Sequence, residues 1–341
     1  MKPKLPKTYI IAEAGVNHNG DIALAKKMIE AAHTAGADAV KFQTFKSEKL
    51  VTTKAAKASY QKMTTAPEES QMAMLQQLEL STMAHAELYE HSKQVGIEFL
   101  SSPFDLESLE FLIKLGVDKI KIPSGEIVNI PFLRKIGASQ KKIILSTGMS
   151  CLGEIEKAIN VIVTAGTPKK NITVLHCNTE YPSPMCDINL KAMQTIGNAF
   201  NVEVGYSDHT LGIEIAIAAV AMGAIIIEKH FTLDRSLPGP DQKASLSPHD
   251  FLQMTKSIRN VEVAMGDGVK RVSPSEAHNL KLVRKYIVAK RNIQSNELFS
   301  NENLCTKRTG KGGCSAALWD KLIGQKAPKA YIKDEIIHWL S

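Results

Sequence analysis

The stretch VEVGYSDHTLGIEIAIAAVAMGAIIIEKHFT, residues 202–232, contains two short apolar runs that each end abruptly in polar residues around a histidine. We predict that each run is a buried strand and that the apolar segment between them, residues 211–223, is a helix. A strand–helix–strand unit makes the two strands parallel, so their carboxyl ends emerge on one face of the sheet. His209 and His230 would then lie close together, and two imidazoles on one face can bind one divalent metal ion. The alternative for each histidine is a structural role in which the ring bonds a backbone carbonyl.

The same alternation of apolar runs and amphipathic segments covers most of the chain before the histidines. Six more strand-like runs begin at Thr8, Ala39, Glu98, Lys119, Lys142 and Ile172. Helical segments between them often end in glycine, as at Gly36, Gly96, Gly116 and Gly223. Eight successive strand–helix units predict a (β/α)₈ TIM barrel. The alternative is a doubly wound open sheet, which would have fewer strands and often a GxGxxG loop that this sequence lacks.

The pattern changes after about residue 266, where the chain becomes polar and rich in turn residues. We therefore expect a catalytic barrel over residues 1–268, a linker over residues 269–284 and a small β-rich domain over residues 285–341. Residues 46–80 are too long for a plain loop within the barrel. We expect them to form an irregular cover over the site followed by a helix, with a solvated excursion as the alternative.

Composition excludes several classes of function. The 341 residues are 44% hydrophobic and 23% charged, with a mild net charge of +7. No block of Lys and Arg interleaved with aromatic residues is present, so we expect no nucleic-acid partner. No apolar stretch is long enough for a signal peptide or a membrane span, so we expect no membrane association. The five cysteines form no CxxC pair, which favours reduced thiols and a cytoplasmic protein.

Polar side chains cluster at the predicted carboxyl ends of the strands, where barrels of this kind hold their active sites. They are Glu13, Lys41, Gln43, Ser102, Lys121, Ser124, Glu126, Ser146, Asn178, Tyr181, Ser207 and Asp241. Lys41 and Lys121 alternate with apolar residues, and a lysine in such a place usually binds an anion or acts as a nucleophile. The alternative is an internal salt bridge to Glu13 or Glu126. Lysines and serines together can hold a phosphate, and with a metal ion they indicate chemistry on a carbonyl by a phosphorylated reactant.

Ordered segments along essentially the whole chain resemble the signature segments of bacterial sialic acid synthases (N-acetylneuraminate synthases). They are IIAEAGVNHNG, VKFQTF, IKIPSGE, LSTGM, LHCNTEYPSP, GYSDHT, EKHFT and PGPD, and the later KRTGKG resembles that family's small antifreeze-like (SAF) domain. The resemblance implies an enzyme that condenses phosphoenolpyruvate with open-chain N-acetylmannosamine and water, giving sialic acid and phosphate. It also implies a divalent cofactor, Mn²⁺ or Mg²⁺.

The resemblance implies a role for each candidate residue. The metal ligands of the family match His209 and His230. Its phosphoenolpyruvate contacts match Lys41, Ser102, Lys121, Ser124, Ser146 and Ser207, with Asn178 or Thr179 beside them. Its contacts to the sugar match Glu13, Gln43, Tyr181 and Asp241. Glu126 matches a carboxylate that handles the proton of water, so Glu126, Glu13 and Lys121 are the expected catalytic residues. Arg308 matches an arginine delivered into the partner subunit's site, which implies a domain-swapped homodimer. The tail motif departs from the family's pattern at Thr309 and Lys311.

Three other functions remain open at this point. A legionaminic acid synthase would use 2,4-diacetamido-2,4,6-trideoxymannose in place of N-acetylmannosamine. A Schiff-base pyruvate aldolase would use Lys121 or Lys41 as its nucleophile. A sugar-binding or ice-binding protein would not turn over a ligand.

Overall fold

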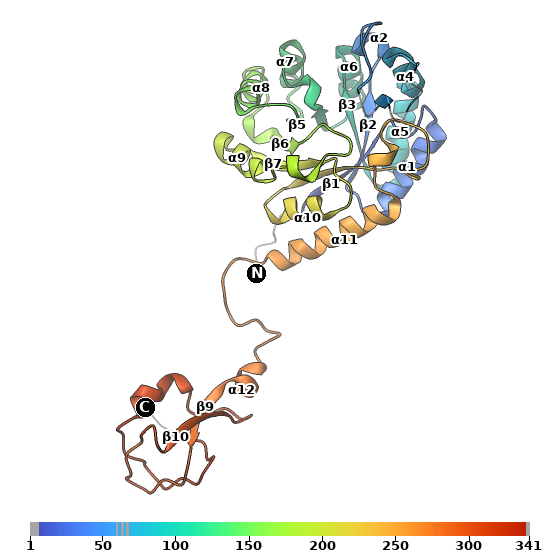
Figure 1. The fold of residues 1–341 in the computed structure, drawn as a ribbon. Coiled ribbons are helices and arrows are strands. Elements are labelled where there is room, and N and C mark those ends of the chain that lie inside the picture. Colours follow the sequence, from blue (N-terminus) through green and yellow to red (C-terminus); the bar gives the residue numbers. More distant parts are fainter. Residues whose placement is uncertain (1–6, 59–60, 63–64, 66–67, 339–341) are drawn as a thin grey trace. The chain divides into compact units, whose positions relative to one another are not determined.

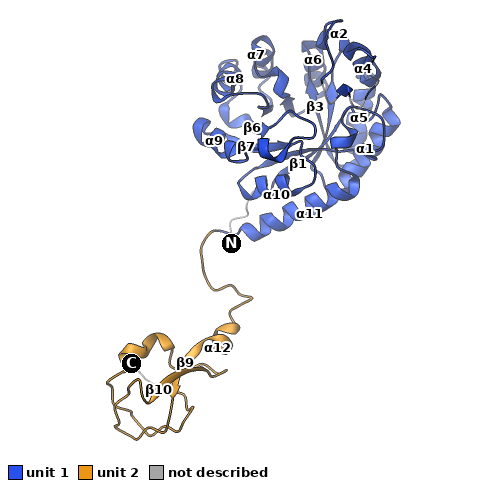
Figure 2. Cartoon of the chain, viewed as in Figure 1, with its two compact units in different colours: residues 1–267 blue, residues 268–341 orange. Residues whose placement is uncertain are grey.

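The computed structural model describes residues 7–58, 61–62, 65 and 68–338. The chain divides into two compact units, residues 1–267 and 268–341 (Figure 2). The first unit is a (β/α)₈ barrel, as predicted from the alternation of apolar runs (Figure 1). None of the helices in the described part of the chain is long and apolar enough to cross a membrane.

Eight parallel strands form the barrel. They are β1 (Tyr9–Gly15), β2 (Ala39–Thr44), β3 (Glu98–Pro103), β4 (Lys119–Ile122), β5 (Lys142–Ser146), β6 (Ile172–Cys177), β7 (Glu203–Asp208) and β8 (Ile226–His230). Their hydrogen-bonded order is β3-β2-β1-β8-β7-β6-β5-β4. The two strands at the ends of this order, β3 and β4, also lie beside each other, so the sheet is a nearly closed barrel.

Helices cover the outside of the barrel (Figure 1). They are α1 (Ile22–Thr34), α5 (Thr82–Val95), α6 (Leu106–Leu115), α7 (Ile130–Ala138), α8 (Leu152–Thr164), α9 (Lys191–Phe200), α10 (Glu214–Ala221) and α11 (Pro248–Met265). Local signals set their ends: Ser81, whose hydroxyl accepts from Ala84 N, caps the start of α5, and Gly96 in the left-handed region caps its end.

The alternation of side chains along each strand determines what lies inside the barrel. Residues two apart share a face, so every second side chain points inward. One apolar cluster at such positions contains Ile11, Ala39, Leu100, Ile144, Leu175 and Ile226. Two residues further along the same strands the sequence carries Glu13, Lys41, Ser102, Ser146, Cys177 and Glu228. All six of these are buried as well, so a polar layer lies directly above an apolar one.

The insertion over residues 46–80 contains α2 (Ser47–Leu50) and α4 (Gln71–Leu78). The expected helix in its second half is therefore present as α4. Residues 59–60, 63–64 and 66–67 of the predicted cover lie outside the described residues.

The second unit has its own small core. It contains α12 (Asn279–Val283), the antiparallel strands β9 (Lys285–Ala289) and β10 (Leu304–Arg308), and α13 (Trp319–Leu322). Ile287, Phe299, Leu322 and Tyr331 are among its buried apolar residues. The segment predicted as a linker contains the short helix α12.

Candidate active site

A cavity of about 320 Å³ lies at the carboxyl ends of the barrel strands. Twelve of the residues predicted from the sequence line it. They are Glu13, Lys41, Gln43, Ser102, Lys121, Ser124, Ser146, Tyr181, Ser207, His209, His230 and Asp241. Residues at or just after the ends of all eight strands therefore converge on one space.

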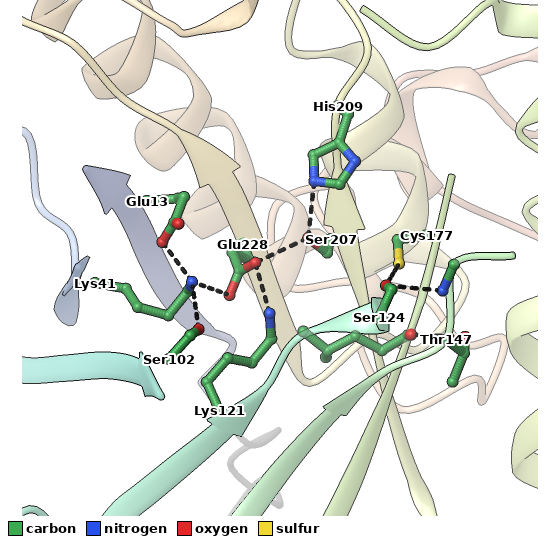
Figure 3. A network of polar contacts seen from close by, with 12 residues as sticks. Glu13, Lys41, Ser102, Lys121, Ser124, Thr147, Cys177, Ser207, His209 and Glu228 are labelled. Atoms are coloured by element: carbon green, nitrogen blue, oxygen red, sulfur yellow. Dashed lines mark hydrogen bonds and ion pairs between the residues drawn. The ribbon is translucent and has the colours of Figure 1, made fainter. Parts of the chain in front are cut away.

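A network of opposite charges occupies the floor of this cavity (Figure 3). Lys41 Nζ lies 2.6 Å from Glu13 Oε2 and donates to Ser102 Oγ at 3.1 Å. Lys121 Nζ donates to Glu228 Oε1 at 2.9 Å, and Lys41 Nζ lies 3.8 Å from Glu228 Oε2. The internal salt bridge considered for Lys41 is thus present. Lys121 instead pairs with Glu228, which is neither of the two partners considered for it, Glu13 and Glu126.

Burial and the neighbouring lysines shift the pKa values of the cavity's carboxyl groups in opposite directions. Burial would raise the pKa of Glu228, but Lys121 and Lys41 outweigh it and hold that pKa below its usual value. Burial raises the pKa of Asp241 to about 6, although Lys41 opposes the shift. Burial likewise raises the pKa of Glu13 against the influence of Lys41. Glu228 is therefore a charged counter-ion of both lysines, while Glu13 and Asp241 lose their protons at a higher pH than ordinary carboxyl groups do.

The two histidines face each other across the ends of β7 and β8. Their ring centroids are 5.3 Å apart, and the ring of Tyr181 lies 4.2 Å from that of His209. His209 Nδ1 contacts the backbone oxygen of Asn178, which leaves Nε2 facing Ser207 Oγ at 3.4 Å. His230 Nδ1 is buried and has no hydrogen-bond partner among the residues that the structure describes. The carbonyl bond considered as an alternative for His209 is present, and it orients the ring without using its second nitrogen.

This arrangement fits a shared divalent ion. Imidazoles that bind one ion at about 2.1 Å, roughly at right angles, have centroids about 5 Å apart. Burial lowers the pKa of His209 to about 4, so the ring is neutral at neutral pH, the form that binds metals. Within the described ranges no group of three or more His, Cys, Asp or Glu side chains is arranged to hold an ion.

Small hydroxyl donors line the cavity near the lysines. Ser146 Oγ is buried without a hydrogen-bond partner in the part of the chain that is described. Ser124 Oγ accepts from Gly148 N at 3.0 Å and lies 3.3 Å from Cys177 Sγ. With two ammonium groups nearby, these donors can hold an oxyanion.

Three predicted site residues do not line the cavity. The side-chain oxygen of Asn178 accepts from Glu180 N and Ser183 Oγ, and Thr179 lines the cavity at this point instead. The carboxylate of Glu126 accepts from Asn129 Nδ2 at 2.6 Å, in a short 3₁₀ turn. Arg308 is exposed at the end of β10 in the second unit.

A buried ion pair is formed by the residues that directly precede the two histidines in the sequence. Lys229 Nζ donates to Asp208 Oδ2 at 2.8 Å and to the backbone oxygen of Thr210 at 2.6 Å, and Asp208 Oδ1 accepts from Thr210 N at 2.9 Å. Both side chains are fully buried, and neither lines the cavity. Neither residue is among the site residues predicted from the sequence. The pair ties the end of β7 to β8 directly beside the two histidines.

Gly15 lies where three polar side chains of the cavity meet. Its φ is +52°, and a Cβ atom there would lie 3.2 Å from Glu13 Oε1, 3.5 Å from Gln43 Nε2 and 3.6 Å from Asp241 Oδ2. The missing side chain thus leaves room between carboxylate and amide groups. Such a set of acceptors and donors suits a polyhydroxylated ligand.

We expect Gly15→Ala to raise the KM for that ligand about tenfold, equivalent to about 1.4 kcal/mol. The matched control is Gly96→Ala, because Gly96 also has a positive φ (+87°) but no atom within 4 Å of its Cβ position. Both variants carry the same kind of backbone strain, about 1–2 kcal/mol. Steady-state kinetics should show the raised KM in the first variant alone; equal KM values in both would show that the crowding is harmless.

Comparisons with known proteins identify the family of the chain. The model of the NeuB family matches residues 28–270. The chain is 56% identical to the N,N'-diacetyllegionaminic acid synthase of Campylobacter jejuni, over 98% of this chain and 99% of that protein. It is 47% identical to the enzyme of the same name from Legionella pneumophila, over 89% and 86% of the two chains. Among solved structures, the N-acetylneuraminic acid synthetase of Leptospira borgpetersenii superposes with a TM-score of 0.70 at 34% identity, over 81% of this chain and 90% of that one.

The chain therefore belongs to the NeuB family, as its resemblance to sialic acid synthases predicted. It is an enzyme of the nonulosonic acid synthase class.

Proposed function

We propose that the protein condenses phosphoenolpyruvate with open-chain 2,4-diacetamido-2,4,6-trideoxymannose and water, giving N,N'-diacetyllegionaminic acid and phosphate. The relatives that carry this product's name are 56% and 47% identical, against 34% for the sialic acid synthetase structure. These relatives favour 2,4-diacetamido-2,4,6-trideoxymannose as the sugar substrate over N-acetylmannosamine, the substrate that the resemblance to sialic acid synthases implied. The observation that carries the chemistry is that two lysines, several serines and two histidines line one cavity.

The lysine side of the cavity suits the phosphate of phosphoenolpyruvate. Lys41 and Lys121 are the two ammonium groups there, and Ser102, Ser124 and Ser146 are the hydroxyl donors. Charge-assisted hydrogen bonds of this kind are roughly twice as strong as neutral ones. The same cations stabilise phosphate as it leaves, because they act where negative charge develops.

The histidine side suits the sugar aldehyde. His209 and His230 would hold a Mn²⁺ or Mg²⁺ ion, which as a Lewis acid polarises a carbonyl oxygen. Glu13, Gln43 and Asp241 meet around Gly15 and would bind the sugar hydroxyls. The enol carbon of phosphoenolpyruvate attacks the aldehyde carbon, water adds to the neighbouring carbon, and the tetrahedral adduct releases phosphate.

We propose Glu126 as the group that takes the proton from water. It follows Ser124 and Gly125, which line the cavity, and its carboxylate would have to leave Asn129 to take part. Glu126→Gln is then expected to lower kcat by about 10²–10⁴ with little change in either KM, because general-base catalysis acts in the transition state. An unchanged kcat would assign the proton to a carboxylate already in the cavity, Glu13 or Asp241.

We also propose that Arg308 serves the site of a second copy of the chain, in a domain-swapped homodimer. The support is the motif around Arg308 and the small size of the second unit, residues 268–341. Arg308→Ala and Lys121→Met should each be nearly inactive, yet subunit exchange between them should restore activity. Mixed dimers would contain one site with both residues intact. A mixture that stays inactive after exchange, shown by differently tagged subunits, contradicts the proposal.

The sugar is tested by competition. Phosphoenolpyruvate is supplied with equal amounts of 2,4-diacetamido-2,4,6-trideoxymannose and N-acetylmannosamine, and both acid products are quantified by mass spectrometry. We expect N,N'-diacetyllegionaminic acid to predominate by at least about tenfold. Predominance of N-acetylneuraminic acid would return the assignment to sialic acid synthase.

A further inference from the structure

Part of the wall of the active-site cavity is apolar, although Gln61 and Gln71 also line the cavity, and the condensation chemistry makes no use of this part. Leu50, Val51, Leu75 and Phe104 line this wall. They belong to a hydrophobic cluster of their own, separate from the barrel core, that forms beneath the insertion between β2 and β3. We call these four residues the apolar wall.

The strand order fixes where the apolar wall stands relative to the histidines. Neighbouring strands run β3-β2-β1-β8-β7. The histidines follow β7 and end β8, and Glu13 and Gln43 lie on β1 and β2. The apolar wall comes from the segment after β2 and the residue after β3. A sugar whose aldehyde lies at the histidines and whose hydroxyls lie along Glu13 and Gln43 therefore directs its far end toward this wall.

We propose that the apolar wall makes the enzyme selective for a sugar whose sixth carbon is a methyl group. This inference rests on the proposed function and names the residues that would choose its substrate. A hydroxyl placed against apolar side chains gives up its hydrogen bonds to water and gains none from the wall. A methyl group at the same point gains dispersion contacts and leaves water.

The expected size of the selectivity follows from the same argument. A hydrophobic pocket rejects a ligand that merely adds a hydroxyl by about a hundredfold. A strong, absolute exclusion is not expected, because nothing charged opposes the hydroxyl along the apolar wall.

The test uses two sugars that differ by one oxygen atom. They are 2,4-diacetamido-2,4,6-trideoxymannose and its 6-hydroxy counterpart, 2,4-diacetamido-2,4-dideoxymannose. For each sugar, kcat/KM is measured by release of phosphate from phosphoenolpyruvate. We expect the wild-type protein to prefer the 6-deoxy sugar by about a hundredfold.

Val51→Thr replaces one methyl by a hydroxyl of nearly the same shape in the apolar wall. It is expected to reduce the preference about tenfold, because the new hydroxyl can bond the 6-hydroxyl. The matched control is Val163→Thr on α8, a partly exposed valine that does not line the cavity. Its preference should equal that of the wild-type protein. If Val51→Thr does not fold, Leu50→Gln introduces a polar group at a second, half-buried position of the wall.

The outcomes separate the two proposals. Equal kcat/KM for both sugars in the wild-type protein, or an unchanged preference in the wall variants, overturns the inference but leaves the synthase function intact. Absence of phosphate release with either sugar overturns the proposed function itself.

Discussion

Replacing Lys121 with methionine is expected to lower kcat/KM for phosphoenolpyruvate by about two to three orders of magnitude. The ammonium group of Lys121 is buried at the end of β4 and bonds Glu228. In the proposed complex it faces the phosphate that leaves. Methionine preserves the length of the side chain, so the loss reports charge. Steady-state phosphate release measures it.

The control for this variant lies on the same strand. Lys119 is two residues earlier, so it points to the same side of β4, but it pairs with Glu98 at the opposite end of the barrel. Lys119→Met should therefore leave kcat/KM unchanged. If both variants lose activity equally, or if Lys121→Met keeps most of it, the assignment of Lys121 to the phosphate is wrong.

Asp208→Asn is expected to destabilise the barrel by about 3–5 kcal/mol, the cost of breaking a buried ion pair by removing one partner. The ammonium group of Lys229 would remain fully buried beside an uncharged amide. Burial already lowers the pKa of Lys229, with Asp208 opposing that shift. Equilibrium unfolding in urea measures the change in the free energy of unfolding.

Two comparisons isolate the buried charge. The double variant Asp208→Asn/Lys229→Met removes both charges and should recover most of the lost stability. Glu110→Gln breaks an ion pair with Lys135 that is about half exposed, and it should leave the unfolding midpoint unchanged. A stability of Asp208→Asn equal to that of the wild-type protein would mean that this pair does not hold β7 to β8.

The barrel and most of the cavity could be predicted because both follow from periodicity. Strand–helix alternation gives parallel strands, and a period of two decides which side chains enter the barrel. His230 and Glu228 are two residues apart and both face the cavity, whereas Lys229 between them faces away. The period of two along a strand is thus enough to predict that Glu228 and His230 face the cavity and that Lys229 faces away.

Other features depend on contacts that no local pattern encodes. Lys121 on β4 meets Glu228 on β8, across the barrel, and the sequence offers no sign that prefers it to Glu126. The choice between Asn178 and Thr179 depends on the turn that follows β6, where Asn178 bonds that turn and Thr179 faces the cavity. The residues of the apolar wall come from α2, α4 and the ends of those elements and of β3, so no single period along the sequence places them together.

The central claim is that phosphate leaves with the oxygen that joined it to carbon, once water has added to that carbon. It is tested most directly with phosphoenolpyruvate that carries ¹⁸O in the oxygen bridging carbon and phosphorus. Mass spectrometry of the products then locates the label. The account predicts that the label leaves with inorganic phosphate, because water supplies the new oxygen and the bridging carbon–oxygen bond breaks. Recovery of the label in the nine-carbon acid, or acid formation without release of phosphate, would contradict it.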